Sequence, residues 1–200
     1  MSHPHFLRTT CRILTLVLVA ATLSGCAAAV IGGVAIGASL SHDRRGSGTV
    51  VEDKSLGVKI RDRLHQPDGP GTGNHIKTIT YNLVVLLLGE VSNDAERQRA
   101  EEIAAEIPTV RWVVNELAVM PQTSLKSRSH DAYLNSKAKT VLFGRGIDGF
   151  DPTRVDVTTV RDTVYLMGLV TKEEAEAAAE RVSRVRGVKK VIKVFEYLET

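Results

Sequence analysis

The stretch Val85-Leu86-Leu87-Leu88-Gly89-Glu90-Val91 returns 79 residues later as Val164-Tyr165-Leu166-Met167-Gly168-Leu169-Val170. The similarity continues in both directions at a displacement of 78. Upstream, Asp53, Leu56, Ile60 and Leu64 return as Asp131, Leu134, Ala138 and Leu142. Downstream, Val110, Val113 and Leu117 return as Val188, Val191 and Phe195. One-residue insertions in loops account for the change of displacement, so the chain contains two copies of one module.

Each copy opens with a predicted helix and a hairpin. In residues 56–64 and 134–142 the apolar side chains recur at helical spacing, and a glycine-rich loop follows. Next come β-branched runs at 76–81 and 155–160. A short polar turn joins each run to one of the two repeated stretches, 85–91 and 164–170, which predicts an antiparallel hairpin.

Each copy closes with a second helix and a third strand. Thr171 and Glu174 have the spacing of a capping box, and the alanine-rich segment after them has one apolar face. Strands are predicted at 113–119 and 191–197, and Trp112, before the first of these, is expected in the core or at an interface. The fold class is therefore α+β: two tandem αββαβ modules, each with a small three-stranded mixed sheet covered by two helices. We expect each module to fold as a separate unit.

The first 25 residues have the features of an export signal. Arg8 and Arg12 precede an uncharged run over 13–21, and small residues follow it. This run alone is too short to span a bilayer. The alternative is a single transmembrane helix that continues to Leu40, but three glycines and the arginines at both ends do not favour it.

Leu23-Ser24-Gly25-Cys26 closes this segment and resembles the lipobox of bacterial lipoproteins. The resemblance implies cleavage before Cys26 and its acylation, which would hold the chain on a bilayer. Ala27, in place of an aspartate, resembles the pattern of outer-membrane sorting. We therefore expect a signal peptide over 1–25, then an acylated cysteine and a flexible tether over 26–49, at the periplasmic face of the outer membrane.

The rest of the chain resembles the BON domain of periplasmic bacterial proteins. The resemblance rests on the glycine-ended strands, the alanine-rich second helix and the closing Gly187-Val188-Lys189-Lys190-Val191. With the lipobox, it extends to the dual-BON outer-membrane lipoproteins associated with division and outer-membrane stress. It implies a first module over 50–120, a linker over 121–130 and a second module over 131–200. It also implies a role in envelope integrity at the division site, with outer-membrane assembly or peptidoglycan-amidase regulatory proteins as partners.

Composition and motifs argue against several classes of function. No cysteine pair remains after the leader, and the histidines lie in the tether or in loops, so neither a thiol nucleophile nor a metal site is expected. Gly144, Gly146 and Gly149 match a dinucleotide-binding fingerprint, but they follow a helix, so we interpret them as a surface turn. We expect neither catalysis nor a cofactor. We also expect no binding of nucleic acid, because an exported protein does not meet it.

Charge differs between the two modules. Residues 50–120 carry 8 basic and 11 acidic side chains, whereas residues 121–200 carry 14 and 11. The excess of cations lies at the entrance of the second module. A further basic group lies near its end, and we interpret it as the solvated flank of an amphipathic helix: Arg181, Arg184, Arg186, Lys189 and Lys190.

The helix predicted over 131–143 has an apolar side and an outward side. At 100° per residue, the residues that face the core are Leu134, Ala138, Val141 and Leu142. The outward residues are Tyr133, Ser136, Thr140 and Phe143, flanked by Lys137 and Lys139. Aromatic rings at the headgroup level, with lysines beside them, form an interfacial helix surface. The alternative is that both rings pack on the first module.

The resemblance favours the lipid interpretation, because similar lipoproteins contact anionic phospholipid through an aromatic at the place of Tyr133. It implies a phospholipid-binding site formed by Tyr133, Lys137, Lys139, Thr140 and Phe143. The expected function is that of a non-catalytic outer-membrane lipoprotein that binds anionic phospholipid. The alternative function is a protein-interaction adaptor for envelope assembly factors, without intrinsic lipid selectivity.

Overall fold

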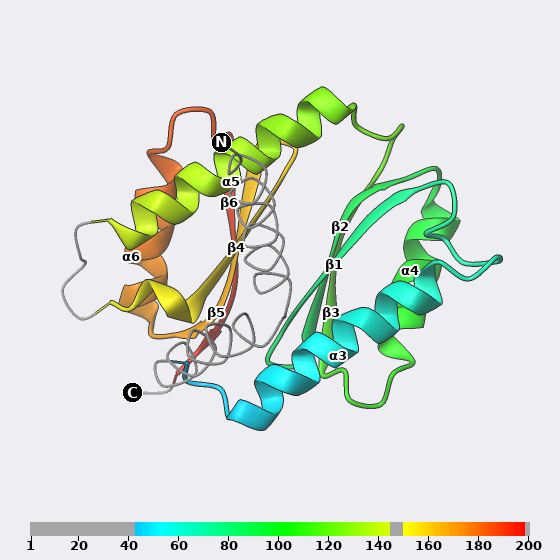
Figure 1. Ribbon diagram of the computed structural model, residues 1–200, viewed down its shortest axis with the longest axis horizontal. Helices are drawn as coiled ribbons and strands as arrows, with labels where there is room; N and C mark the ends of the chain where they lie inside the picture. The colour runs from blue at the N-terminus through cyan, green and yellow to red at the C-terminus, as the bar shows by residue number, and fades with distance from the viewer. Residues whose placement is uncertain (1–42, 145–149, 199–200) are drawn as a thin grey trace, which may run out of the picture. The chain divides into compact units, whose positions relative to one another are not determined.

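The computed structural model describes residues 43–144 and 150–198, which belong to one compact unit. The predicted order of helices and strands occurs twice (Figure 1). The first module contains α3 (Ser47–Leu64), β1 (His75–Tyr81), β2 (Val84–Val91), α4 (Asp94–Ala105) and β3 (Trp112–Val119). The second contains α5 (Leu125–Phe143), the short 3-10 helix η1 (Pro152–Arg154), β4 (Val155–Val160), β5 (Thr163–Val170), α6 (Lys172–Ser183) and β6 (Lys190–Tyr197).

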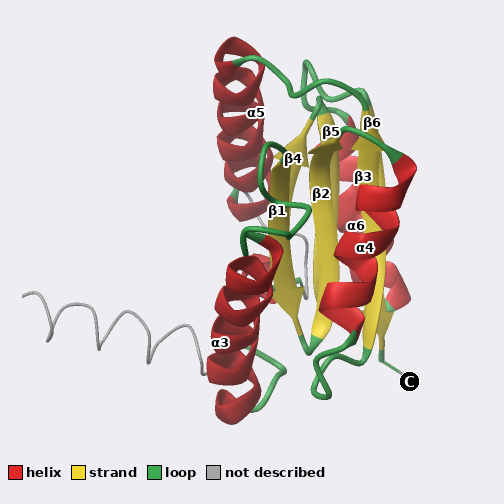
Figure 2. Ribbon diagram, turned by 90° about the vertical axis from the view of Figure 1, so that its right-hand side faces the viewer, coloured by secondary structure: helices red, strands yellow, loops and turns green. Residues whose placement is uncertain are grey.

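Each module has a three-stranded sheet in which the second strand is central. β1 and β2 are antiparallel, with Ile79 opposite Leu86, and β2 and β3 are parallel, with Leu86 opposite Val114. The second sheet repeats this arrangement in β4, β5 and β6. In each module the opening helix runs alongside the first strand and the second helix packs on the other two (Figure 2). The predicted αββαβ order and mixed sheets are confirmed.

Side-chain caps determine where the second helices begin. The Thr171 hydroxyl accepts from the Glu174 N–H at 3.3 Å, and Glu174 Oε2 accepts from the Thr171 N–H at 2.9 Å, so the predicted capping box is confirmed. In α4 the Asn93 side chain accepts from the Glu96 N–H at 2.9 Å. Glu96 reaches the N–H of Ser92 rather than that of Asn93, so this cap is only half of a box.

Both opening helices begin earlier than predicted. α5 begins at Leu125 rather than at 131, because the Ser124 hydroxyl caps it by accepting from the Ser127 N–H at 3.2 Å. Leu125 itself is 78% exposed, so hydrophobic periodicity did not reveal this first turn. α3 begins at Ser47, within the segment that was expected to be tether.

A buried aspartate on each opening helix holds the hairpin turn of its module. Asp53 accepts from two turn N–H groups, both at 2.8 Å, and Asp131 accepts from two at 2.9 Å. The turn residues are Asn82 and Leu83 in the first module and Arg161 and Asp162 in the second. All four have a φ between 51° and 62°, the type I′ geometry that favours glycine, yet none is glycine. The aspartates therefore stabilise turns in which Leu83 and Arg161 adopt a conformation that such side chains disfavour, which explains why an aspartate recurs in both copies.

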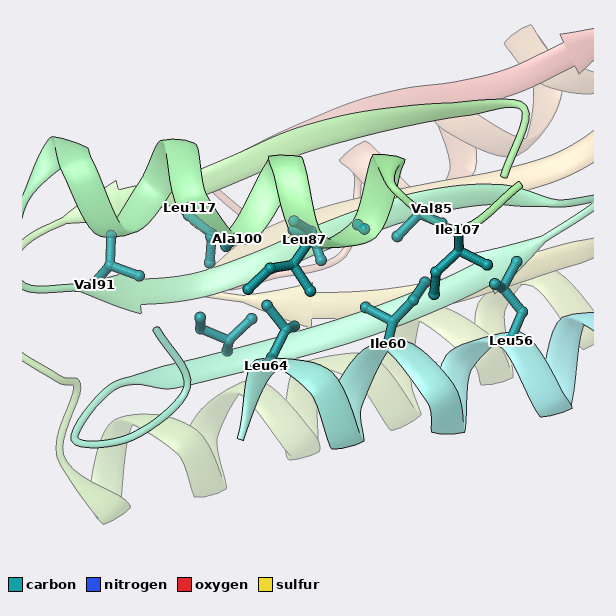
Figure 3. Packing of buried hydrophobic residues seen from close by; sticks show 12 residues of the cluster. Leu56, Ile60, Leu64, Val85, Leu87, Val91, Ala100, Ile107 and Leu117 are labelled. Carbon is teal, nitrogen blue, oxygen red and sulfur yellow. The ribbon is translucent and has the colours of Figure 1, made fainter. Parts of the chain in front are cut away.

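Each module has a hydrophobic core between its sheet and its helices. In the first module, α3 packs against β2 and α4 through residues that include Leu56, Ile60, Leu64, Leu87, Ala100 and Ile107 (Figure 3). The core of the second module includes Ala138, Leu142, Val157, Val164, Leu166, Ala178 and Val182. Two predictions were wrong. Val141 is 37% exposed, and Trp112 is 42% exposed because it begins an edge strand, where the Arg111 guanidinium lies 4.6 Å from its ring centroid.

The other faces of the two sheets share a third hydrophobic core. Its buried members are Tyr81, Val84, Leu86 and Leu88 from the first module and Val160, Tyr165 and Met167 from the second. Successive residues of a strand point to opposite faces, so Leu86 lies in the shared core and Leu87 in that of its own module. Every residue of β2 is buried as a result. Separate folding of the modules, expected from the sequence, would leave this shared core uncovered in each of them.

The chain just before α3 contacts both modules. Arg45 Nη1 lies 2.7 Å from Asp53 Oδ2, and the Arg45 guanidinium lies 3.7 Å from the Tyr81 ring centroid. Arg44 Nη2 donates to Glu174 Oε1 at 3.0 Å in the second module. Burial alone would raise the pKa of the Glu174 carboxyl, but the hydrogen bond from Arg44 helps to hold that pKa below its usual value. Residues 43–45 are thus part of the folded unit.

Candidate functional site

The outward side of α5 is open to solvent. Tyr133 is 60% exposed and Phe143 is 56% exposed, while Leu134 on the opposite side is fully buried. Ser136 and Thr140, which lie between the two aromatics in sequence, are also exposed. Neither ring is buried against the first module, which was the alternative to a surface role. Both rings are therefore available to a partner.

Lys137 lies one helical turn after Tyr133, and the two side chains meet. The Lys137 Nζ is 5.3 Å from the centroid of the Tyr133 ring, within the range of a cation–π interaction. The same Nζ donates to the backbone carbonyl of Arg186 at 3.2 Å. The Thr140 hydroxyl donates to the Ser136 carbonyl at 2.9 Å, which leaves the lone pairs of its oxygen available. Tyr133 and Lys137 thus form one aromatic and cationic pair at the surface.

The other two predicted residues lie on a different flank of α5. Successive residues of a helix advance by about 100°, so Lys139 lies about 200° around the axis from Lys137. Phe143 lies about one turn after Lys139, in the last turn of the helix, and both are exposed. The structure therefore brings Tyr133 and Lys137 into contact, with Thr140 exposed two turns after Tyr133, and leaves Lys139 and Phe143 on the other side of Thr140.

A groove of about 380 Å³ runs between α5 and the end of α6. It is lined by Lys137, Val141, Arg181, Arg184, Val185 and Arg186. Four of these six side chains are cationic and the other two are valines. The groove explains why Val141 is not in the core, since it faces this opening rather than the sheet.

Three of the groove's cations were not predicted as site residues. Arg181, Arg184 and Arg186 were interpreted as a solvated flank, but they lie beside Lys137. The Arg181 Nη1 donates to the Val141 carbonyl at 3.4 Å, which ties α6 to α5. The three-residue spacing of Arg181 and Arg184 places them on one side of α6, but the spacing does not show which other helix packs beside that side.

A glycine allows the segment after α6 to approach α5. Gly187 has a φ of +106°, a conformation that L side chains rarely adopt. A Cβ atom at this position would lie 2.8 Å from Leu134 Cδ2. The glycine thus lets the backbone turn closely over Leu134, and this turn positions the neighbouring Arg186 at the groove.

Two predicted features fall outside the residues that the structure describes. Cys26 lies outside the described residues, as do residues 145–149 of the glycine-rich turn. Among residues 43–144 and 150–198, no cluster of three or more histidine, cysteine or carboxylate side chains is arranged to hold a metal ion. Within the same part of the chain, none of the helices is both long enough and apolar enough to cross a membrane.

Comparison with known proteins gives consistent matches along the chain. The family model described as BON domain matches residues 52–121 and 130–199. The chain is 38% identical over 178 residues to Outer membrane lipoprotein DolP of Haemophilus influenzae, which covers 88% of this chain and 91% of that protein. It is 30% identical over 157 residues to the 21 kDa hemolysin of Actinobacillus pleuropneumoniae, which covers 78% of this chain and 80% of that protein. Each of the two segments that match the family model contains one three-stranded sheet.

Proposed function

This chain belongs to the BON domain family, with two tandem copies of the domain, and we propose that it is an outer-membrane lipoprotein that binds anionic phospholipid through its second copy. It acts by binding rather than by catalysis and supports the integrity of the cell envelope, at the division site. The proposed limits are those expected from the sequence: a signal peptide over 1–25, the acylated Cys26 and its tether up to 49, and modules over 50–120 and 131–200. The name of the Haemophilus relative supports the outer membrane as the location.

The observation that carries the lipid proposal is the open outward side of α5. The Tyr133 ring is 60% exposed and has the Lys137 Nζ 5.3 Å from its centroid. An exposed aromatic ring with a lysine beside it is typical of a helix that lies at a bilayer interface. Transfer of a large apolar side chain out of water contributes about 1.5–3 kcal/mol. Each lysine near an anionic leaflet adds about 1 kcal/mol. Tyr133 and Phe143 would supply the apolar part, and Lys137 and Lys139 the charge.

Tyr133→Glu should reduce the affinity for anionic vesicles by about 10-fold to 100-fold, because it removes the ring and adds a like charge near the phosphates. Lys137→Ala should reduce the affinity for the same vesicles only about fivefold. High salt should abolish this electrostatic contribution of Lys137, since the Debye length falls to about 3 Å at 1 M. The measurement is flotation of residues 43–200 with phosphatidylglycerol vesicles. This range keeps Arg44 and Arg45, which contact both modules.

Val119→Glu is the matched control, because it places the same charge at an exposed apolar residue of the first module. It should leave flotation unchanged. Thermal melts should agree among all variants, since none of the three positions is buried. Unchanged vesicle binding by folded Tyr133→Glu would refute the outward side of α5 as the lipid surface, and a parent protein that does not bind the vesicles would favour the adaptor function.

Cys26→Ala should abolish incorporation of labelled palmitate in bacterial cells, because the sulfur that would carry the lipid is gone. The variant should also leave the membrane fraction or accumulate as an uncleaved precursor. Cys11→Ala is the matched control, since it removes the other cysteine of the chain, from within the leader, and should still be acylated. Palmitate label in the Cys26→Ala variant would refute the lipobox interpretation.

A further inference from the structure

We propose that the groove between α5 and α6 binds the phosphate of an anionic phospholipid, with Arg181 and Arg186 as its principal ligands. The inference rests on the proposed function and deepens it, because it names the chemical group that the second module recognises. An interfacial helix with lysines attracts any anionic surface. A site with donors arranged around one phosphate would, in addition, select lipids that carry a phosphodiester over lipids with another negative group.

The groove has more cationic donors than its internal contacts use. Arg184 is paired with Glu180 one turn earlier on α6. Arg181 and Lys137 each make one hydrogen bond to a backbone carbonyl, at 3.4 and 3.2 Å, which leaves further N–H groups on both. The Arg186 guanidinium makes no hydrogen bond or ion pair with the rest of the described chain. Positive charge therefore collects in the groove without a matching number of carboxylates.

Arginine suits this role better than lysine. Its planar guanidinium can donate two parallel hydrogen bonds to one phosphate, whereas an ammonium acts as a point charge. Arg186 is also held in place through its backbone, since its carbonyl accepts from Lys137 Nζ and Gly187 fixes the turn that follows. The Lys137 contact links the groove directly to the Tyr133 ring.

The valines argue for a lipid rather than for a free phosphate ion. Val141 and Val185 lie among the four cations, and Val141 is 37% exposed. A free ion gains nothing from apolar walls, whereas the glycerol and acyl carbons next to a lipid phosphate do. Lys137 and Val141 lie one and two turns after Tyr133 along α5, so a lipid headgroup beside the Tyr133 ring is within reach of the groove.

The test compares two double variants of residues 43–200, which form one compact unit with all three hydrophobic cores inside it. Arg181→Gln with Arg186→Gln removes two cations from the groove. Lys172→Gln with Lys190→Gln removes two cations from exposed positions elsewhere in the second module. The vesicles contain phosphatidylglycerol, or a carboxylate amphiphile at equal surface charge.

Diffuse attraction predicts the same loss for both pairs, at most about fivefold per cation. We expect the groove pair to lose at least tenfold more affinity than the control pair on phosphatidylglycerol, and no more than the control pair on the carboxylate vesicles. Arg186→Lys keeps the charge and should still lose part of the phosphatidylglycerol affinity. Thermal melts verify that each variant is folded.

Equal losses for the two pairs on phosphatidylglycerol would overturn the phosphate site. If Tyr133→Glu still weakens binding in that case, the proposed function survives without the groove. If neither Tyr133→Glu nor the groove pair changes binding, the proposed function itself fails. Saturation of the groove by inorganic phosphate at a concentration that leaves vesicle binding unchanged would overturn the assignment to a lipid and favour a site for the free ion.

Discussion

Residues 121–200 alone should show no cooperative thermal transition, whereas residues 43–200 should melt cooperatively. Removal of the first module uncovers the second module's half of the shared core, in which Val160, Tyr165 and Met167 are at most 5% exposed. Each such side chain contributes about 1.5–3 kcal/mol when it is buried. The three together are comparable to the whole stability of a typical domain, about 5–15 kcal/mol.

Calorimetry and near-UV circular dichroism of the two fragments check this expectation. The fragment should also associate as its concentration rises, because it exposes a contiguous apolar sheet face. Leu86→Glu in residues 43–200 tests the same contact without deletion and should destabilise both modules together. Val58→Glu, at an exposed residue of α3, is its control. A cooperative melt of residues 121–200 near that of residues 43–200 would show that the shared core contributes little.

Asp131→Ala should lower the stability of residues 43–200 by about 3 kcal/mol or more. The substitution removes two hydrogen bonds to a carboxylate, each worth about 1.5–3 kcal/mol. It also removes the groups that hold Arg161 and Asp162 at positive φ. At about 2–4 °C per kcal/mol for a chain of this size, the melting temperature should fall by roughly 6–12 °C.

Asp156→Ala is the matched control, because this aspartate lies in β4 of the same module and is only partly buried. It should change the melting temperature by no more than a few degrees. Asp131→Asn keeps one acceptor oxygen and should lie between the two. Arg161→Gly with Asp162→Gly should recover part of the loss in the Asp131→Ala background, because glycine adopts positive φ without steric cost. A melting temperature unchanged by Asp131→Ala would show that the turn is stable without its aspartate.

The elements of the fold were predictable because their signals are local. Thr171 and Glu174 form a capping box through residues three apart, and the apolar residues of α3 and α6 recur at a helical period. The recurrence of Asp53 as Asp131 was visible in the sequence, but its cause was not. Both aspartates bind backbone N–H groups about 30 residues away, and no sequence pattern marks that contact.

The candidate site was only partly predictable for the same reason. The exposure of Tyr133 and Phe143 follows from their angular position on α5, away from the side on which Leu134, Ala138 and Leu142 are buried. The cations of the groove belong to α6 and the turn after it, so their position beside Lys137 depends on how two helices pack. Val141 was assigned to the core from its angle on α5, and it faces the groove because the packing partner on that side is α6 rather than the sheet.

Periodicity, helix caps and residue spacing within one module were enough to predict the duplication, the αββαβ order, the mixed sheets and the outward side of α5. The cover on the second face of each sheet and the cations around Lys137 depend on how distant segments pack. Burial of an apolar face lowers the free energy wherever the covering surface comes from, so the sequence does not identify that surface. Leu86 and Leu88 are apolar in the sequence, but the partner that buries them is the other copy of the same module.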